Sequence, residues 1–136
     1  MASTSARVYF ALSGYNFDPE IVTEVLDMEP TSMNSAGVHA SADSPAISTW
    51  EYSTGTERDN IDIYNMTGKL IEEIEPVKDK ILKVIESHNL SPRFVAVLRL
   101  SCEDDTLPDL AFGARSIRFM SEIGAFIDVD YRLINK

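Results

Sequence analysis

The sequence RFVAVLRL at residues 93–100 decides the fold, because an apolar side chain occupies every second position along its whole length. Phe94 begins a set of apolar residues at the even positions, and the odd positions also include two valines. A period of two is typical of a β-strand, and apolar residues on both faces are typical of a strand in the middle of a sheet. We therefore expect residues 93–100 to form a central strand, around which the other elements are arranged.

A long helical region precedes this strand, at residues 61–89. Apolar side chains recur there at spacings of three and four residues, which builds one apolar stripe along a helix. Pro76 interrupts the region, because proline lacks an N–H donor and crowds the carbonyl four residues before it. Since the stripe keeps its phase across Pro76, we expect one kinked helix, with two helices meeting near Glu75 as the alternative.

The remaining segments complete the order β-α-β-α-β-α-β. Alternation predicts further strands at residues 7–13, 47–53 and 125–133, and apolar spacing predicts helices at residues 18–28 and 114–123. The first and last strands each have a polar side, so we do not expect helices on both faces of the sheet. The sequence therefore predicts a single α+β domain at residues 7–134, with a mixed, mostly antiparallel sheet and helices packed on one face.

Expectations also follow for four further segments. Residues 1–6 are small and polar, which predicts a flexible N-terminus without the apolar core of a signal peptide. Residues 31–48 are rich in serine and alanine and form a long irregular loop, a kind of segment that often carries function. Residues 54–60 indicate a polar turn around Gly55, and residues 107–112 indicate a short extended piece.

The charge of the chain excludes several kinds of partner. Its 12 Lys and Arg residues against 22 Asp and Glu residues give a formal net charge of −10 at pH 7. This charge repels polyanions, so we expect neither nucleic-acid binding nor attachment to an anionic membrane. It steers the protein toward basic partners, although solubility is an alternative reason for it. No apolar run approaches the roughly 20 residues that a membrane span needs, and we expect a cytoplasmic protein.

Acidic residues gather in two segments, and we take them as candidate contacts for a basic protein. They are Glu57, Asp59, Asp62, Glu103, Asp104, Asp105 and Asp109. Their spacing does not follow a calcium-binding EF-hand loop, and the glycine that such a loop needs at its bend is missing, so we expect no metal and no cofactor. The alternative is a solvated run of charges without a partner.

The sequence contains no recognisable catalytic set. It has neither a glycine-rich phosphate loop nor a metalloprotease motif, and its two histidines, His39 and His88, are far apart in the sequence. The single cysteine, Cys102, excludes an internal disulfide. We therefore expect a non-enzymatic interaction domain, for example an immunity-type protein that binds and neutralises a basic bacterial toxin.

Asp128 and Asp130 support a different hypothesis. They lie two residues apart on a predicted strand, so both point to one side, where they could hold a cation or share a proton. With Trp50 and Tyr131 they would form a cleft near the loop at residues 31–48, in a ligand-binding or enzymatic domain. The alternatives are a solvated face or ion pairs with arginines of a neighbouring strand. A third hypothesis is a homodimer joined through an exposed apolar face or edge of the sheet.

Several short segments in combination resemble a known family. They are SGYNFDPE at residues 13–20, LDMEPT at residues 26–31, STW at residues 48–50 and IGAFIDVDY at residues 123–131. This pattern is similar to a bacterial family called domain of unknown function 4279, over roughly residues 7–134. Family members usually carry basic residues and a Gly-Asp pair after the Glu-Pro-Thr element, whereas residues 32–38 here read SMNSAGV. The resemblance implies the limits of the fold, and it implies no chemistry because the family has no established activity.

Overall fold

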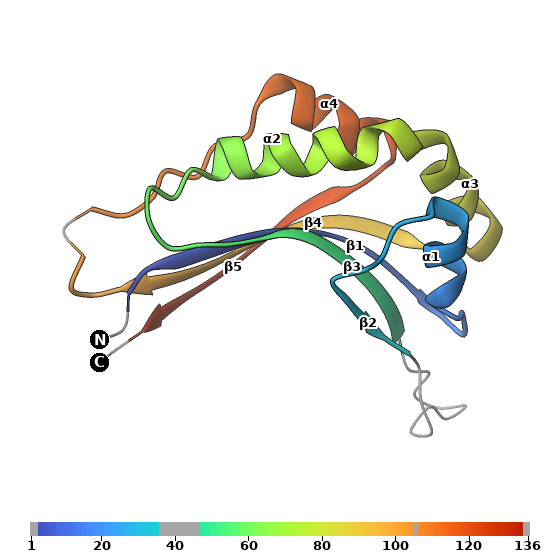
Figure 1. The fold of residues 1–136 in the computed structure, drawn as a ribbon, viewed down its shortest axis with the longest axis horizontal. Helices are drawn as coiled ribbons and strands as arrows, with labels where there is room; N and C mark the ends of the chain where they lie inside the picture. Colours follow the sequence, from blue (N-terminus) through green and yellow to red (C-terminus); the bar gives the residue numbers. More distant parts are fainter. Residues whose placement is uncertain (1–2, 36–46, 105, 135–136) are drawn as a thin grey trace.

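Strand β4 (Ser91–Ser101) contains the predicted central stretch, and it lies inside the sheet between β1 (Ser5–Tyr15) and β5 (Phe126–Ile134). The computed structural model describes residues 3–35, 47–104 and 106–134 (Figure 1). These residues form a five-stranded sheet of order β2-β3-β1-β4-β5, in which β2 is Ser32–Asn34 and β3 is Ile47–Glu57. The pair β4–β5 is parallel and the other pairs are antiparallel, so the predicted mixed sheet is confirmed.

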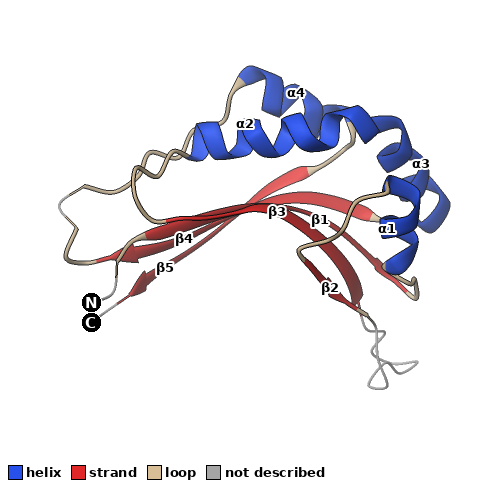
Figure 2. Cartoon of the chain, in the orientation of Figure 1, coloured by secondary structure: helices blue, strands red, loops and turns tan. Residues whose placement is uncertain are grey.

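The helices lie over one face of the sheet, as predicted (Figure 2). They are α1 (Glu20–Leu26), α2 (Ile63–Ile74), α3 (Lys78–His88) and α4 (Ala114–Glu122). Helices α2 and α4 lie above the middle of the sheet, and α1 and α3 lie at one end of it (Figure 1). None of the helices in the described part of the chain combines the length and the hydropathy that crossing a membrane requires. We call the opposite side of the sheet, which these helices leave uncovered, the open face.

Alternation along β1 and β4 places the core between the sheet and the helices. The ring of Phe10 on β1 lies at its centre, with ring centroids 5.1 Å from Phe94 on β4 and 6.4 Å from Trp50 on β3. Phe94 in turn lies 6.4 Å from Phe119 of α4. Each of these four side chains is at most 1% exposed. Complete burial of one such side chain stabilises the fold by roughly 1.5–3 kcal/mol.

Pro76 separates two helices instead of bending one. Helix α2 ends at Ile74, the 3₁₀ turn η1 (Glu75–Val77) follows, and α3 begins at Lys78. The chain tightens here because proline cannot donate the hydrogen bond that a continuous helix needs. The expectation of one kinked helix is therefore wrong, and the alternative of two helices is confirmed. The apolar stripe still continues across the turn, since Ile74 and Ile81 are both fully buried.

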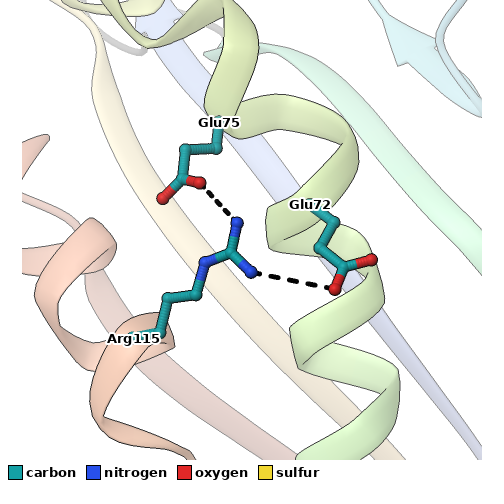
Figure 3. A network of polar contacts seen from close by, with 3 residues as sticks. All are labelled: Glu72, Glu75 and Arg115. Atoms are coloured by element: carbon teal, nitrogen blue, oxygen red, sulfur yellow. Dashed lines mark hydrogen bonds and ion pairs between the residues drawn. The ribbon is translucent and has the colours of Figure 1, made fainter.

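Arg115 at the start of α4 links this corner to the neighbouring helix (Figure 3). Its Nη2 donates to Oε1 of Glu75 at 2.6 Å, and its Nη1 lies 3.7 Å from Oε1 of Glu72. The hydrogen bond from Arg115 lowers the pKa of Glu75. Because the pKa in the folded state lies below that in the unfolded chain, the contact stabilises the fold above the unfolded pKa, and this contribution is lost as the pH falls through the folded pKa.

The limits of several segments differ from the sequence prediction. Strand β1 begins at Ser5, so the flexible N-terminus expected at residues 1–6 is wrong for residues 5 and 6. Strand β2 was not predicted, because its three residues are all exposed and show no alternation with a buried side. Residues 107–112 form no strand.

Strand β3 continues to Glu57, where we expected a turn at residues 54–60. A β-bulge accounts for the difference, because Thr54 and Gly55 together lie opposite the single residue Val8 of β1. Gly55 has a φ angle of 128°, which a residue with a Cβ atom rarely adopts. The glycine that indicated a turn therefore introduces one extra residue into a strand.

Beyond the bulge, each side chain of β3 points to the face opposite to the one that unbroken alternation would give. Thr56 pairs with Arg7 on the open face, and Glu57 pairs with Ala6 on the side of the helices. Without the extra residue, the strict alternation of the strand would place each of these side chains on the other face. The bulge therefore turns the carboxylate of Glu57 to the side of the helices and the hydroxyl of Thr56 to the open face.

Candidate functional site

Three of the predicted acidic contacts gather where β3 leads into α2. Glu57 ends β3, Asp59 and Asp62 lie in the connection, and all three line a pocket of about 220 Å³. Asp62 also caps α2, because its side chain accepts a hydrogen bond from the backbone N–H of Asn65 at 3.2 Å. Lys69 lines the same pocket, so three carboxylates face one ammonium group and the pocket keeps a net negative charge.

Asp104 and Asp109 line a larger, open pocket of about 640 Å³. The loop that carries them is fixed to the start of β1 by Thr4. The hydroxyl group of Thr4 donates a hydrogen bond to the carboxylate of Asp104 and accepts one from the backbone N–H of Ser101 at 2.9 Å. Arg58 also lines this pocket, at the side of the open face.

The two pockets adjoin, because Asn60 lines both of them. The connection before α2 and the loop after β4 lie at the same end of the molecule (Figure 1). The structure therefore brings together two groups of acidic residues that are far apart in the sequence. We call this region the acidic surface and define it as Glu57, Asp59, Asp62, Asp104 and Asp109. Glu103 is exposed in the same loop, and Asp105 lies outside the described residues.

The acidic surface suits several separate ion pairs. Its five carboxylate side chains are all exposed. Over the described ranges of the chain, no three His, Cys, Asp or Glu residues are placed so that they could hold one metal ion. Carboxylates spread in this way can each pair with a different Lys or Arg of a partner, and exposed pairs of this kind contribute about 0.2–1 kcal/mol each.

The residues of the alternative cleft do not meet. Trp50 is fully buried on β3, where its indole N–H donates to the hydroxyl of Thr23 at 3.0 Å. Strand β5 lies on the far side of β1 and β4 from β3. Asp128 and Asp130 share the open face, as the two-residue spacing predicted, whereas Tyr131 pairs with a core residue of β4 and points to the side of the helices. The four residues therefore do not line one cleft.

Asp128 and Asp130 lie on a solvated part of the open face. The register of β5 places them beside Val95 and Val97 of β4, not beside an arginine. Both side chains are exposed, and Asp130 is paired within its own strand, with its Oδ1 3.9 Å from Nε of Arg132. This arrangement matches the alternative of a solvated face.

The open face also carries arginines that the sequence analysis did not identify as a group. Arg7, Arg93, Arg99 and Arg132 come from β1, β4 and β5, and each occupies a position on this face. The guanidinium group of Arg7 lies over the ring of Tyr9, 4.6 Å from its centroid. Burial raises the pKa of the Tyr9 hydroxyl. Alternation within each strand could have indicated the face of these arginines, but their grouping depends on strand order.

Comparison with known proteins gives a family and no close relative. The sequence model of a family described as "Domain of unknown function (DUF4279)" matches residues 4–133, which extends from the start of β1 almost to the end of β5. No curated protein and no solved structure matches the chain. The description of the family names no activity, so the functional argument depends on the geometry described above.

Proposed function

The chain belongs to the DUF4279 family, and we propose that this member is a non-enzymatic interaction domain that binds a basic protein through its acidic surface. One specific form of this function is an immunity-type protein, which neutralises a basic bacterial toxin by covering its cationic surface. The observation that carries the proposal is the meeting of two acidic groups, one from residues 57–62 and one from residues 104–109, around Asn60.

Electrostatics supports a partner of this kind. Charges on a protein surface act over about 8 Å at physiological salt, so carboxylates in adjoining pockets add to one local negative potential. Such a potential raises the rate at which a cationic surface approaches in a productive orientation. The net charge of −10 gives the same sign at long range. A toxin that binds nucleic acid presents cations to phosphates, and the carboxylates would take the place of those phosphates.

The first test compares two variants with the same change in net charge. The site variant carries Glu57→Gln, Asp59→Asn and Asp109→Asn, and it retains Asp62 and Asp104 because these side chains also hold local structure. Loss of three exposed ion pairs of about 0.5 kcal/mol each should weaken binding about tenfold. The probe is a fluorescein-labelled decalysine peptide, and the measurement is fluorescence anisotropy at about 50 mM and 150 mM NaCl.

The control variant carries Glu24→Gln, Asp79→Asn and Glu86→Gln. These exposed residues lie on α1 and α3, at the other end of the molecule. We expect this variant to bind the peptide within about twofold of the wild type. If both variants weaken binding equally, net charge alone attracts the peptide and the acidic surface is not a site.

The immunity role needs a separate experiment. The genes beside its own are first searched for a basic toxin, whose absence would contradict this role. The chain is then coexpressed with that toxin, and growth of the cells is measured. We expect the wild type and the control variant to restore growth and the site variant to fail. Protection by none of the three chains would contradict the immunity role, and equal protection by all three would show that the acidic surface is not the site that binds the toxin.

A homodimer is a second candidate, favoured by the exposed apolar side chains of β5. Ile127, Tyr131 and Leu133 are 40%, 69% and 70% exposed, and they point to the side of the helices at a place that the helices do not cover. Strand β5 is also an edge of the sheet within the described residues, so its outer backbone groups have no strand partner there. Edges of this kind readily pair with another strand.

Two copies of β5 can pair in an antiparallel arrangement that suits their side chains. With Tyr131 on the twofold axis, Asp130 of one copy lies opposite Arg132 of the other, and Val129 lies opposite Leu133. Oppositely charged and apolar cross-strand pairs stabilise a sheet by roughly 0.2–1 kcal/mol each. We expect light scattering to give the mass of a dimer for the wild type.

The dimer is tested by reversing one charge at this edge. Arg132→Asp would place like charges opposite each other twice and should give a monomer. Arg118→Asp makes the same change at an exposed site of α4 and should leave the dimer intact. A wild type that scatters as a monomer, or equal masses for the two variants, would contradict the pairing.

A further inference from the structure

A pocket of about 260 Å³ opens on the open face, where β1 begins and β3 and β4 end, next to the acidic surface. Its lining includes three arginines, Arg7, Arg58 and Arg99, and two residues with hydroxyl groups, Ser5 and Thr56. No acidic residue lines it. The chain has a net charge of −10, so the positive charge of this pocket is opposite in sign to the charge of the whole protein. We call it the arginine pocket.

Strand register holds these side chains together. Arg7 of β1 lies opposite Thr56 of β3 on one side and opposite Val97 of β4 on the other. Arg99 of β4 lies opposite Ser5, two residues before Arg7. Residues in this diagonal relation share a face and are close enough for long side chains to reach each other, so Arg7 and Arg99 face the same space.

The third strand contributes through the bulge at Gly55. The extra residue turns Thr56 to the open face, where it faces Arg7. Arg58 follows directly after the end of β3 and completes the lining on that side. The bulge that brings Glu57 to the acidic surface therefore also brings Thr56 to the arginine pocket.

The positive charges of this pocket are not balanced by ion pairs. Across the described ranges, no ion pair involves Arg7, Arg58 or Arg99. Arg132, the neighbour of Arg99 on β5, is by contrast paired with Asp130. Like charges on neighbouring strands repel each other and destabilise a sheet. An anion bound between the guanidinium groups would remove this repulsion.

We propose that the arginine pocket binds the phosphate group of a small molecule, either inorganic phosphate or a phosphate monoester. A guanidinium group presents N–H donors in a planar fork that matches two phosphate oxygens, and the hydroxyl groups of Ser5 and Thr56 add further donors. The volume is below the roughly 300–1,000 Å³ of pockets for drug-sized ligands, and the net charge repels polyanions, so a small anion fits and a nucleic acid does not. This proposal does not rest on the partner of the acidic surface.

Isothermal titration calorimetry tests the proposal directly. The whole chain is titrated with sodium phosphate, with O-phosphoserine as a monoester, and with sodium chloride at the same ionic strength. We expect saturable binding of phosphate or phosphoserine and none of chloride. Binding of both shows that the free anion is sufficient, and binding of phosphoserine alone assigns the pocket to an ester. If neither saturates, or if chloride behaves like phosphate, the proposal is wrong.

Three variants identify the pocket as the binding site. Arg99→Gln and Arg58→Gln should each weaken binding about tenfold or more, because each removes a charged fork. Arg118→Gln, on α4 outside this pocket, should bind within about twofold of the wild type. Arg7 is retained because it also packs on Tyr9. Arg58 lies outside the strands, so its variant keeps the test decisive even if Arg99→Gln does not fold. Equal binding by all three variants would overturn the assignment.

Discussion

Replacement of Phe10 by alanine is expected to lower the free energy of unfolding by about 3–5 kcal/mol, the largest change that we predict for a single residue. Phe10 is fully buried, and its backbone pairs with both neighbouring strands of β1, opposite Tyr52 and Phe94. Its ring contacts Trp50 edge-on and lies tilted against Phe94. Removal of the ring would leave a cavity between the sheet and the helices that the fixed strands cannot close.

Urea unfolding followed by circular dichroism measures this effect, with the free energy extrapolated to water. Phe126→Ala is the matched control, because it removes the same side chain from a position that is 50% exposed on β5. We expect the control to lower the free energy of unfolding by less than about 1 kcal/mol. Similar losses for the two variants would mean that Phe10 is not the centre of the core.

Phe10 also illustrates how much of the fold the sequence could predict. Its strand and β4 were correctly predicted, because buried side chains recur at every second position and leave a pattern that needs no partner to be recognised. Strand β2 left no such pattern, since its exposed residues are strand residues only because β3 pairs with them. At Pro76 the spacing of apolar residues is compatible both with one kinked helix and with two helices, and the structure has two.

The sequence predicts which residues form the acidic surface, but it does not predict that the two acidic segments meet. Composition and local clustering indicate both acidic groups in the sequence. Their meeting at Asn60 depends on the position of β1 between β3 and β4, which places the ends of these strands at one end of the sheet. Sequence reasoning about a single segment contains no information about strand order.

The alternative cleft shows the same limit. Spacing correctly placed Asp128 and Asp130 on one face of a strand. It did not show that β5 is the parallel strand at the far edge of the sheet, a position that follows from the crossover through α4. The predicted cleft therefore joined Trp50 on β3 to residues of β5, although β1 and β4 lie between these two strands. The arginine pocket was missed for the complementary reason, because Arg7, Arg58 and Arg99 belong to three separate segments.

Gly55 carries the second large prediction, because its backbone conformation decides the faces of Thr56 in the arginine pocket and of Glu57 in the acidic surface. Gly55→Ala should lower the free energy of unfolding by about 1–3 kcal/mol. A Cβ atom at this position would meet no other atom within 4 Å, so the loss would come from the φ angle of 128° and not from a steric clash with neighbouring residues. Relief of the strain by loss of the bulge would turn Thr56 and Glu57 to the opposite faces.

The matched control is the same substitution at a glycine without this constraint. Gly68 lies inside α2, and a Cβ atom there would also meet nothing within 4 Å. Gly68→Ala should raise the free energy of unfolding by about 0.4–1 kcal/mol, because alanine restricts the unfolded chain and favours a helix. Urea unfolding of both variants should therefore give changes of opposite sign. A stabilising Gly55→Ala would show that the backbone at this position is not restricted to glycine and would contradict the prediction.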